Sequence, residues 1–360
     1  MTGMYIGSTT GRSGKSLLSF SIGVMLQKAG LRVGYMKPVG RIPQKKDELT
    51  GDADALVVQE ILGQNAPANV LTPVMIPENL HALSVHEYTE QALERIAGCY
   101  AELSADKDVT LVSGSGAFPA SGRFAGVDGL ALLRRLDLKV LLVERLGRRF
   151  GFNYDQLLLL KDLLGPALLG VVLNDVREED QRDAARLLRP WLEEHGIPVL
   201  GALPHTPDLT AMRILDIAHG LDGRVVAGSA NSSRMVGNFL IGTMQVDNFM
   251  MHLRRREGCA VIVGGDRSDL QLAALYASSP CIILTGNIAP SELIRAKAEK
   301  LGVTLVVVRE DTYLVAREMA RILKSKKIRD LKQVQIGLQL VEQCFDPTPL
   351  LGLLPGSALS

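Results

Sequence analysis

The stretch MYIGSTTGRSGKS, residues 4–16, decides the fold of this chain. It runs from a short apolar segment into a loop of small residues that ends in Gly14-Lys15-Ser16, and a helical pattern follows directly. Such a loop wraps phosphates, because its N–H groups converge on the anion, the helix N-terminus adds a positive dipole and the lysine adds charge. The usual pattern has glycine where this chain has Thr9, and the alternative is a Gly/Ser-rich turn that caps a helix without a ligand. We interpret the stretch as a phosphate-binding loop.

The composition excludes several classes of protein. Lys plus Arg number 40 against 39 Asp plus Glu, so no net field recruits nucleic acid or an acidic membrane surface. The cysteines are scattered without a C-x-x-C pair and the histidines form no close pair, which speaks against a disulfide framework or a zinc site. No signal-like segment opens the chain, and no apolar run is long enough to span a membrane. We therefore expect a cytoplasmic protein that binds neither nucleic acid nor membrane.

Short β-branched runs alternate with longer helical patterns over the first two hundred residues, which is typical of βαβ units and a parallel sheet. A shorter α/β pattern follows. The predicted fold class is α/β: a P-loop NTPase-like parallel sheet flanked by helices, followed by a smaller α/β domain. The expected strands are 4–6, 32–37, 109–112, 139–143, 168–173 and 199–203, then 260–263, 281–284 and 304–308.

A Gly/Ser/Asn-rich segment marks the boundary between the two patterns. We predict domains at 1–226 and 236–335, joined by a linker at 227–235 and followed by a C-terminal tail at 336–360. The end of the tail is rich in Pro, Leu and Gly, which indicates extended chain that could pack on a neighbour.

Four further motifs fall where predicted strands end, on the edge at which parallel sheets bind ligands. Lys37 could hold an anionic group, or be an ordinary exposed lysine. Asp52 and Asp54 open a helix, where a carboxylate caps the helix, ligates Mg²⁺, or does both. A Gly/Ser turn at 113–116 would let backbone approach a ligand. Asn174 could present its amide to an adenine edge, or satisfy a turn.

Taken in order, the loop, Lys37, Asp54, the Gly-x-Gly turn and the segment LNDV at 173–176 resemble the dethiobiotin synthetase family. Residues 1–225 look more closely like the dethiobiotin-synthetase-like domain at the N-terminus of some phosphotransacetylases. The resemblance implies that ATP and Mg²⁺ bind here, with Lys15 and Lys37 as catalytic lysines and Asn174 reading adenine. It implies Ser16 and Asp54 as metal ligands. The residues implied to hold the nucleotide are Thr10, Gly11, Arg12, Ser13, Gly14, Lys15, Ser16 and Asn174.

One departure from the family bears on chemistry. The family turn after the third strand usually reads Val-Glu-Gly, with a glutamate that helps to hold the metal, and this chain has Ser113 there. Losing that carboxylate weakens Mg²⁺ binding. Asp52 or Glu144 could supply a replacement, which would favour an enzyme. Otherwise a nucleotide pocket persists without ligase chemistry.

Residues from about 236 to 323 resemble the DRTGG domain. The resemblance rests on VGGDRSD at 263–269, LTGNIAPS at 284–291 and EDTY at 310–313, each between an expected strand and an expected helix. These segments suit a small anionic ligand or a contact between subunits, and the alternative is a set of helix caps. The candidates for a ligand site are Gly265, Asp266, Arg267, Thr285, Gly286, Asp311 and Thr312.

Three functions are compatible with these motifs. We expect a nucleotide-binding regulatory protein, in which ATP and the DRTGG module influence each other. The second is an ATP-dependent ligase that acts on a small carboxylate or carbamate, and the third is a scaffold with a vestigial pocket. We expect no phosphotransacetylase catalytic domain after these modules, and no glutamine-hydrolysing Cys-His module, because Cys344 lacks an oxyanion turn.

A homodimer is also expected. The family that the first domain resembles dimerises through this fold, and residues 239–251 carry Met and Phe at mixed spacing. The alternative for that segment is the ordinary core of the second domain.

Overall fold

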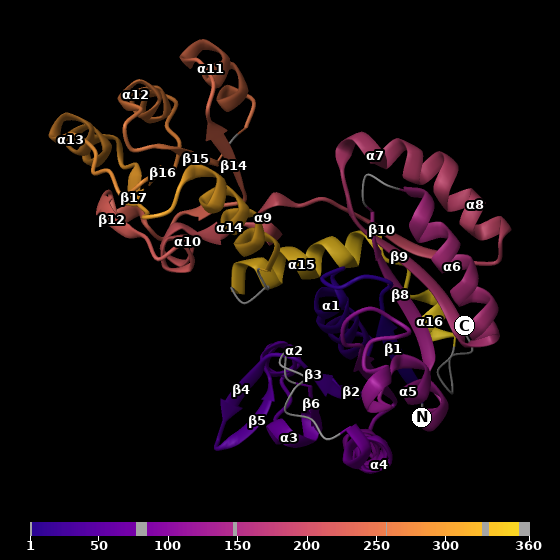
Figure 1. Cartoon of the computed structure of the whole chain (residues 1–360). Coiled ribbons are helices and arrows are strands. Elements are labelled where there is room, and N and C mark those ends of the chain that lie inside the picture. The colour runs from indigo at the N-terminus through magenta and orange to yellow at the C-terminus, as the bar shows by residue number, and fades with distance from the viewer. Residues whose placement is uncertain (1, 77–84, 147–149, 257, 326–330, 353–360) are drawn as a thin grey trace. The chain divides into compact units, whose positions relative to one another are not determined.

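The computed structural model of the chain describes residues 2–76, 85–146, 150–256, 258–325 and 331–352. They form two compact units (Figure 1): the first is Met1–His205 with Arg329–Ser360, and the second is Thr206–Ile328. The first unit is therefore discontinuous in sequence. This division differs from the predicted boundary at residue 226 and from the predicted separate tail, for reasons that lie in the packing of individual elements.

Six parallel strands form the sheet of the first unit, in the order β10-β9-β8-β1-β7-β2. Each overlaps a strand expected from the sequence, so the parallel α/β fold is confirmed. The β-branched runs are good signals because strands covered on both faces carry mostly apolar side chains. The first strand lies in the middle, so the phosphate loop opens at the centre of the edge where the strands end. The strands are β1 Thr2–Gly7, β2 Val33–Met36, β7 Val109–Ser113, β8 Lys139–Arg145, β9 Leu168–Val176 and β10 Val199–Pro204.

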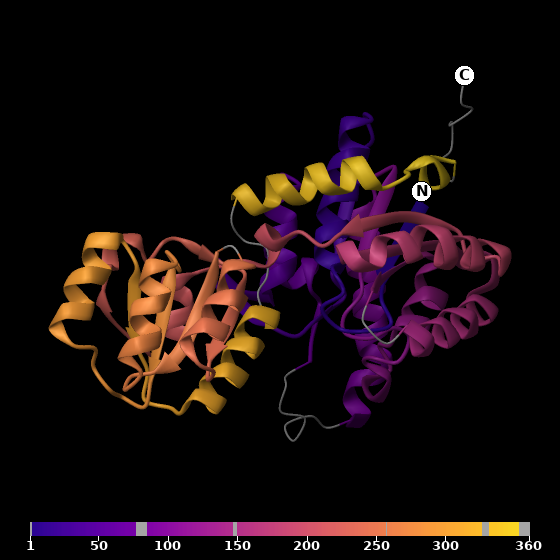
Figure 2. The same cartoon turned by 90° about the horizontal axis from the view of Figure 1, so that it is seen from above.

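Helices cover both faces of this sheet (Figures 1 and 2). Val112 of β7 packs in a core with side chains of α4, α5, α6 and α8, whereas its neighbour Leu111 lies against Gly23 of α1. The alternation of strand side chains thus assigns one set of helices to each face. The helices are α1 Lys15–Lys28, α2 Ala53–Ile61, α3 Ala68–Leu71, α4 Val85–Ser104, α5 Gly129–Leu136, α6 Phe150–Leu164, α7 Glu178–Asp183 and α8 Arg189–Glu194, with 3₁₀ turns at Arg123–Ala125 and Gly165–Ala167 and a π turn at Ala184–Leu188.

A C-terminal helix of the first unit packs on the helix that follows the phosphate loop. This helix, α15 (Leu331–Cys344), lies along α1, and Lys28 of α1 forms an ion pair with Glu342 of α15. Directly after α15, Phe345 forms a β-bridge with Gly201 of β10. The side of α15 that is buried is formed by Gln333, Val334, Gly337 and Val341.

The predicted tail at 336–360 therefore starts inside helix α15, whose buried face the tail prediction did not anticipate. The extended chain predicted for the end of the tail is wrong at 348–351, which are helical. One more helix, α16 (Thr348–Leu351), follows. The rest of the predicted tail, 353–360, lies outside the described residues.

Two pairs of short strands accompany the sheet. β3 (Val39–Gly40) pairs with β6 (Val74–Met75), and β4 (Pro43–Lys46) forms a hairpin with β5 (Leu49–Asp52). The sequence analysis missed the hairpin because most of its residues are exposed and polar, so no apolar alternation marks it. The hairpin matters for the site, since β5 delivers Asp52 to the first turn of α2.

The second unit has its own five-stranded sheet, in the order β12-β17-β16-β15-β14. All neighbours are parallel except β12 and β17. Apolar cores lie on its two faces. The strands of the sheet are β12 Arg224–Ala227, β14 Asn238–Gly242, β15 Cys259–Gly264, β16 Cys281–Thr285 and β17 Thr304–Val307. A separate short pair is formed by β11 Met212–Arg213 and β13 Met235–Val236. The helices are α9 Pro207–Thr210, α10 Ile214–Gly220, α11 Val246–Arg254, α12 Ser268–Tyr276, α13 Glu292–Leu301 and α14 Thr312–Ser325, with a 3₁₀ turn at Ser229–Asn231.

The pairing of strands in this second sheet places the domain boundary earlier in the chain than predicted. Because β12 pairs with β17, residues 206–226 belong to the second unit, and the predicted linker at 227–235 lies inside it. The segment 239–251, which suggested a dimer interface, is partly core: Phe249 is fully buried, while Met251 is 46% exposed. Burying a phenylalanine contributes about 1.5–3 kcal/mol to folding. In the part of the chain that the structure describes, every helix is too short or too polar to cross a bilayer.

Candidate functional site

The phosphate loop joins β1 to α1 in a shape that requires glycine at one position. Gly14, the residue before α1, has φ of 102°, and a Cβ atom there would lie 2.2 Å from the side-chain nitrogen of Asn174. That nitrogen donates a hydrogen bond of 2.8 Å to the carbonyl of Ser13. Asn174, which the family resemblance assigns to adenine, therefore lies directly on the phosphate loop. By helix geometry the N–H groups of the first turn of α1 have no partner within the helix and point toward the loop.

Lys15 lies at the mouth of this loop. Its ammonium group donates hydrogen bonds to the hydroxyl of Ser8 (2.6 Å) and to the carbonyl of Gly116 (2.8 Å). Among the described residues no carboxylate lies within ion-pair distance of it. Burial disfavours its charged form and Lys37 repels it, which lowers the pKa of Lys15 to about 8. The site thus holds a cation whose charge is not neutralised by direct contact.

Thr9, the residue that departs from the usual loop pattern, binds a glutamate from a neighbouring strand. The carboxylate of Glu144, near the end of β8, accepts hydrogen bonds from the N–H of Thr9 (2.8 Å) and from its hydroxyl (2.5 Å). Glu144 is only 2% exposed. Burial raises its pKa, although the two bonds from Thr9 act in the opposite direction.

Lys37, at the end of β2, forms a buried ion pair. Its ammonium lies 2.6 Å from Asp52 and 3.4 Å from Asp54. Asp52 also accepts hydrogen bonds from the N–H groups of Arg41 and Ile42, and it is the N-cap residue of α2. In contrast to Lys15, Lys37 thus has its charge balanced inside the protein.

These contacts bear on the carboxylate that could replace the missing family glutamate. Both oxygens of Glu144 bind Thr9, and Asp52 binds Lys37 and caps α2, so each already serves the protein's own structure. Asp54 is half-buried and close enough to Lys15 to raise the lysine's pKa, and Ser16 begins the first turn of α1. Across the described ranges, no group of three or more His, Cys, Asp and Glu residues is arranged to hold a metal by itself. The carboxylate of Asp54 and the hydroxyl of Ser16 are a suitable protein contribution to an Mg²⁺ ion whose other ligands are phosphate oxygens and water.

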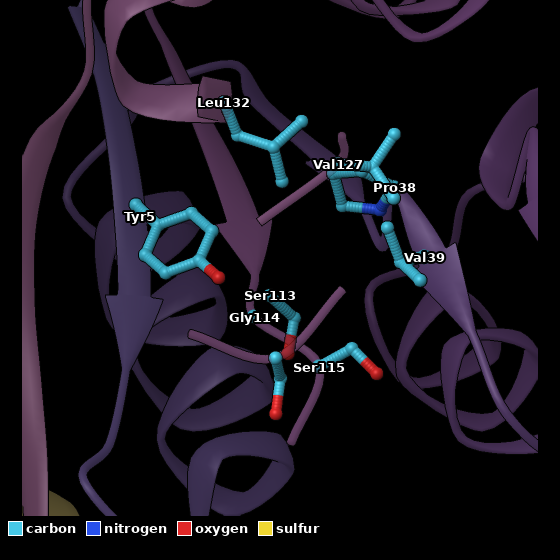
Figure 3. A pocket seen from close by; sticks show the side chains of 9 residues that line it. Tyr5, Pro38, Val39, Ser113, Gly114, Ser115, Val127 and Leu132 are labelled. Carbon is cyan, nitrogen blue, oxygen red and sulfur yellow. The ribbon is translucent and has the colours of Figure 1, made fainter. Parts of the chain in front are cut away.

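A small pocket opens beside the loop (Figure 3). Ser113 ends β7 and the other two serines follow in the loop after it; Arg41 donates a hydrogen bond to one of these, Ser115 (3.2 Å). The ring of Tyr5 closes one side, and burial raises the pKa of its phenol. Serine hydroxyls line this pocket together with apolar side chains, and its free space is about that of one water molecule. It is lined by Tyr5, Pro38, Val39, Ser113, Gly114, Ser115, Ser121, Val127 and Leu132.

A charged cluster that no sequence motif predicted lies next to Asn174. Asp175 has φ of 61° and accepts hydrogen bonds from Arg145 (2.6 Å) and from the ring of His205 (2.5 Å). These residues end β8, β9 and β10, so the sheet order alone brings them together. The Asn-Asp pair at a strand end was the one visible signal in the sequence.

Comparison with known proteins places these features in a family. A family model described as an AAA domain matches residues 2–213, more than half of the chain. The chain belongs to the AAA domain family. A DRTGG domain model matches residues 216–322, so this P-loop AAA domain is fused to a DRTGG domain.

Curated relatives of this AAA–DRTGG chain are phosphate acetyltransferases. The protein from Pseudomonas aeruginosa is 27% identical over 360 residues, which cover 92% of this chain and 49% of the relative. The protein from Synechocystis sp. is 23% identical, with 98% and 51% covered. The chain spans about half the length of the curated relatives it matches.

Solved structures also match. The septum site-determining protein MinD of Pyrococcus horikoshii, complexed with Mg-ADP, is 14% identical over 58% of this chain and 83% of that chain, with a TM-score of 0.37. The CBS and DRTGG domains of the Clostridium perfringens pyrophosphatase, complexed with diadenosine tetraphosphate, are 16% identical over 45% and 84%, with a TM-score of 0.29.

In the DRTGG domain, the predicted ligand residues lie at the ends of β15, β16 and β17, and many of them bind their own loops. Arg267 pairs with Asp269, and Asp311 accepts hydrogen bonds from two N–H groups at the start of α14. The hydroxyls of Thr285 and Thr312 lie 2.8 Å apart and join two of the loops. Gly265 donates from its N–H to the carbonyl of Thr285, Gly286 donates to that of Glu310, and Asp266 is exposed. The sheet brings the three segments to one edge, as the sequence indicated.

Proposed function

We propose that the AAA domain binds ATP with Mg²⁺ at the phosphate loop, and that the chain is a regulatory nucleotide-binding protein. The observation that carries this proposal is Lys15. A half-buried ammonium at the mouth of a phosphate loop, with no carboxylate in contact among the described residues, favours an anion from outside the protein. Charge-assisted hydrogen bonds to phosphate would replace the bonds to Ser8 and Gly116.

The other residues have roles consistent with this proposal. The loop at 10–14 and the first turn of α1 would hold phosphate oxygens with their N–H groups. Ser16 and Asp54 would hold Mg²⁺, which neutralises phosphate charge when it is bound. Asn174, fixed to the loop through Ser13, would contact the adenine. In the DRTGG domain, the seven candidate residues would hold a small anionic ligand, and the two domains would influence each other.

A ligase is the second candidate. Serine hydroxyls of the pocket beside the loop, with Arg41 hydrogen-bonded to Ser115, support it as groups that could hold a small carboxylate or carbamate near a phosphate. Against it stands Ser113, because the carboxylates that could replace the family glutamate are engaged elsewhere. Within a longer protein of the acetyltransferase type, the chain would regulate acetyl transfer rather than perform it, as a homodimer or a larger assembly. A scaffold with a vestigial pocket is the third candidate, and it predicts no nucleotide affinity.

Isothermal titration of Mg-ATP into the chain tests these candidates, with Lys15→Ala alongside. Regulatory binding predicts micromolar affinity that the variant loses, with no release of phosphate over hours. Steady phosphate release that depends on an added small carboxylate would favour the ligase. No heat of binding by the unmodified chain would reject both and leave the scaffold.

A further inference from the structure

Glu144 is a buried carboxylate that the proposed nucleotide chemistry does not use. It lies near the end of β8, the strand that pairs with β1, and is 2% exposed. An ionised side chain rarely lies so deep without partners, because removing it from water is costly. Its partners are the N–H and the hydroxyl of Thr9, one for each carboxylate oxygen.

Two simpler roles fit Glu144 poorly. As a metal ligand it would have to give up at least one bond to Thr9. As a counterion for Lys15 it acts only at a distance: its charge raises the lysine's pKa, but the lysine's hydrogen bonds go to Ser8 and Gly116. What the carboxylate does contact is Thr9, the second residue after β1.

We propose that Glu144 is a positioning residue that holds the phosphate loop in its binding shape through Thr9. An N–H group in such a loop is an anion-binding group, and here the protein supplies the anion for one of them itself. With Thr9 fixed, the chain leaves β1 in one direction, and the residues that follow present their N–H groups to an external phosphate. This inference rests on the proposed nucleotide site for its consequence on affinity, but not for its consequence on the loop.

The same contact explains why threonine stands where the usual pattern has glycine. Glycine at position 9 would offer only the N–H, whereas Thr9 adds a hydroxyl that binds the second oxygen of Glu144. Threonine also has fewer accessible backbone conformations than glycine when unfolded, so less entropy is lost when the loop orders. Thr9 and Glu144 therefore act as one device that orders the loop before any ligand arrives, which improves affinity by lowering the cost of binding.

Four variants of the full chain test the role of the contact between Thr9 and Glu144. Glu144→Ala removes both acceptors, whereas Glu144→Gln can still accept from the N–H of Thr9 and donate to its hydroxyl. Thr9→Val removes only the hydroxyl bond, and Thr9→Ser keeps it. The first measurement is hydrogen exchange at the Thr9 amide without nucleotide, and the second is the dissociation constant for Mg-ATP.

We expect about tenfold faster exchange and about tenfold weaker Mg-ATP binding for Glu144→Ala, because a charge-assisted buried bond is lost. Glu144→Gln should keep most of the protection against exchange and most of the Mg-ATP affinity. Thr9→Ser should exchange more slowly and bind Mg-ATP more tightly than Thr9→Val. The double variant Thr9→Val/Glu144→Ala should be no worse than Glu144→Ala alone, since Glu144→Ala already removes the bond to the Thr9 hydroxyl. Additive losses would mean that Glu144 acts on the loop by a route other than Thr9, and would overturn the inference.

Unchanged exchange at Thr9 in a folded Glu144→Ala variant would overturn the inference, and so would tighter binding of Mg-ATP. If Glu144→Ala does not fold, Thr9→Val decides: exchange and affinity equal to those of Thr9→Ser would overturn it. If the unmodified chain binds no Mg-ATP, the proposed function fails, while the exchange measurement still decides the role of Glu144.

Discussion

The strands of both sheets end in loops of similar composition, but the side chains of these loops bind different kinds of partner in the two domains. At the edge of the AAA domain, side chains bind across long distances in sequence: Thr9 to Glu144, Lys15 to the turn after β7, and Lys37 to Asp52. At the edge of the DRTGG domain, charged side chains bind close neighbours, as Arg267 does with Asp269. Glycines, hydroxyls and carboxylates after strands therefore do not by themselves mark a charged site.

Burial accounts for the difference. Lys37, Asp52 and Glu144 are all less than 9% exposed, so their charges interact in a medium that screens them weakly. The side chains of Arg267 and Asp269 are 37% and 47% exposed, and water screens their interaction. The first edge is therefore built around fixed charges. The second is held mainly by caps and by the contact between Thr285 and Thr312.

The largest effect we expect is on stability, at Lys37. Lys37→Met leaves Asp52 buried without its counterion and should lower the free energy of unfolding by about 3 kcal/mol. Urea unfolding followed by circular dichroism measures this. Lys37→Met/Asp52→Asn should recover most of the loss, because asparagine still caps α2 and carries no charge. A loss that persists in the double variant would mean that Lys37 acts through packing instead.

Next in size is the effect of Lys15 on nucleotide affinity. Lys15→Ala should weaken Mg-ATP binding about 100-fold, because it removes the charge that is not neutralised inside the protein. Arg267→Ala, which removes a cation from the other edge, should leave the affinity unchanged when no ligand of the DRTGG domain is present. Isothermal titration of both variants makes the comparison. Equal losses would show that Mg-ATP does not distinguish the two edges.

A third test uses pH. The pKa of Lys15 is lowered to about 8 by burial and by Lys37, so the ammonium is present at pH 7 and is lost as pH rises through 8. Mg-ATP affinity should therefore be constant below pH 7 and about tenfold weaker at pH 9. Lys15→Arg should show no such fall, since arginine stays charged. A fall of equal size in the arginine variant would assign the titration to another group.

The smallest effect should come from a cap in the DRTGG domain. Asp311→Ala removes hydrogen bonds of 2.7 Å and 3.0 Å to the N–H groups of Tyr313 and Leu314 and should cost about 1 kcal/mol. Asp311→Asn should cost less, because asparagine is also a good cap. Thermal unfolding gives both values. Mg-ATP affinity altered by either variant would show that the second edge communicates with the first.

Local patterns predicted most of the fold. The six strands of the first sheet and β15, β16 and β17 of the second follow from β-branched runs, whereas β14 was not predicted; the phosphate loop follows from GKS at a strand-to-helix junction. The hairpin β4–β5 was missed because its strands lack apolar alternation. Helix α15 carries a recognisable apolar face, but no local pattern says that this face covers α1 rather than the DRTGG domain.

The site was less predictable, since its contacts depend on which strands are neighbours. The positions of the motifs along the chain predicted that Lys37, Asp52 and Asp54 lie on one edge. They did not predict that Asp52 is the buried partner of Lys37. The bond from Thr9 to Glu144 joins residues 135 apart in sequence. The sequence analysis named Glu144 only as a stand-in for a metal ligand, because nothing near it in the sequence shows that its strand lies beside β1.

The return of α15 to the first unit has a consequence for biosynthesis. One side of α1 is covered by α15, a helix whose buried residues include Val334 and Val341, so the AAA domain cannot complete its packing until residue 344 has left the ribosome. Until then α1 presents an uncovered apolar surface, which chaperones bind and which promotes aggregation. The DRTGG domain, whose strands are contiguous in sequence, has all its parts earlier. The later half of the chain is thus free to fold before the first half is finished.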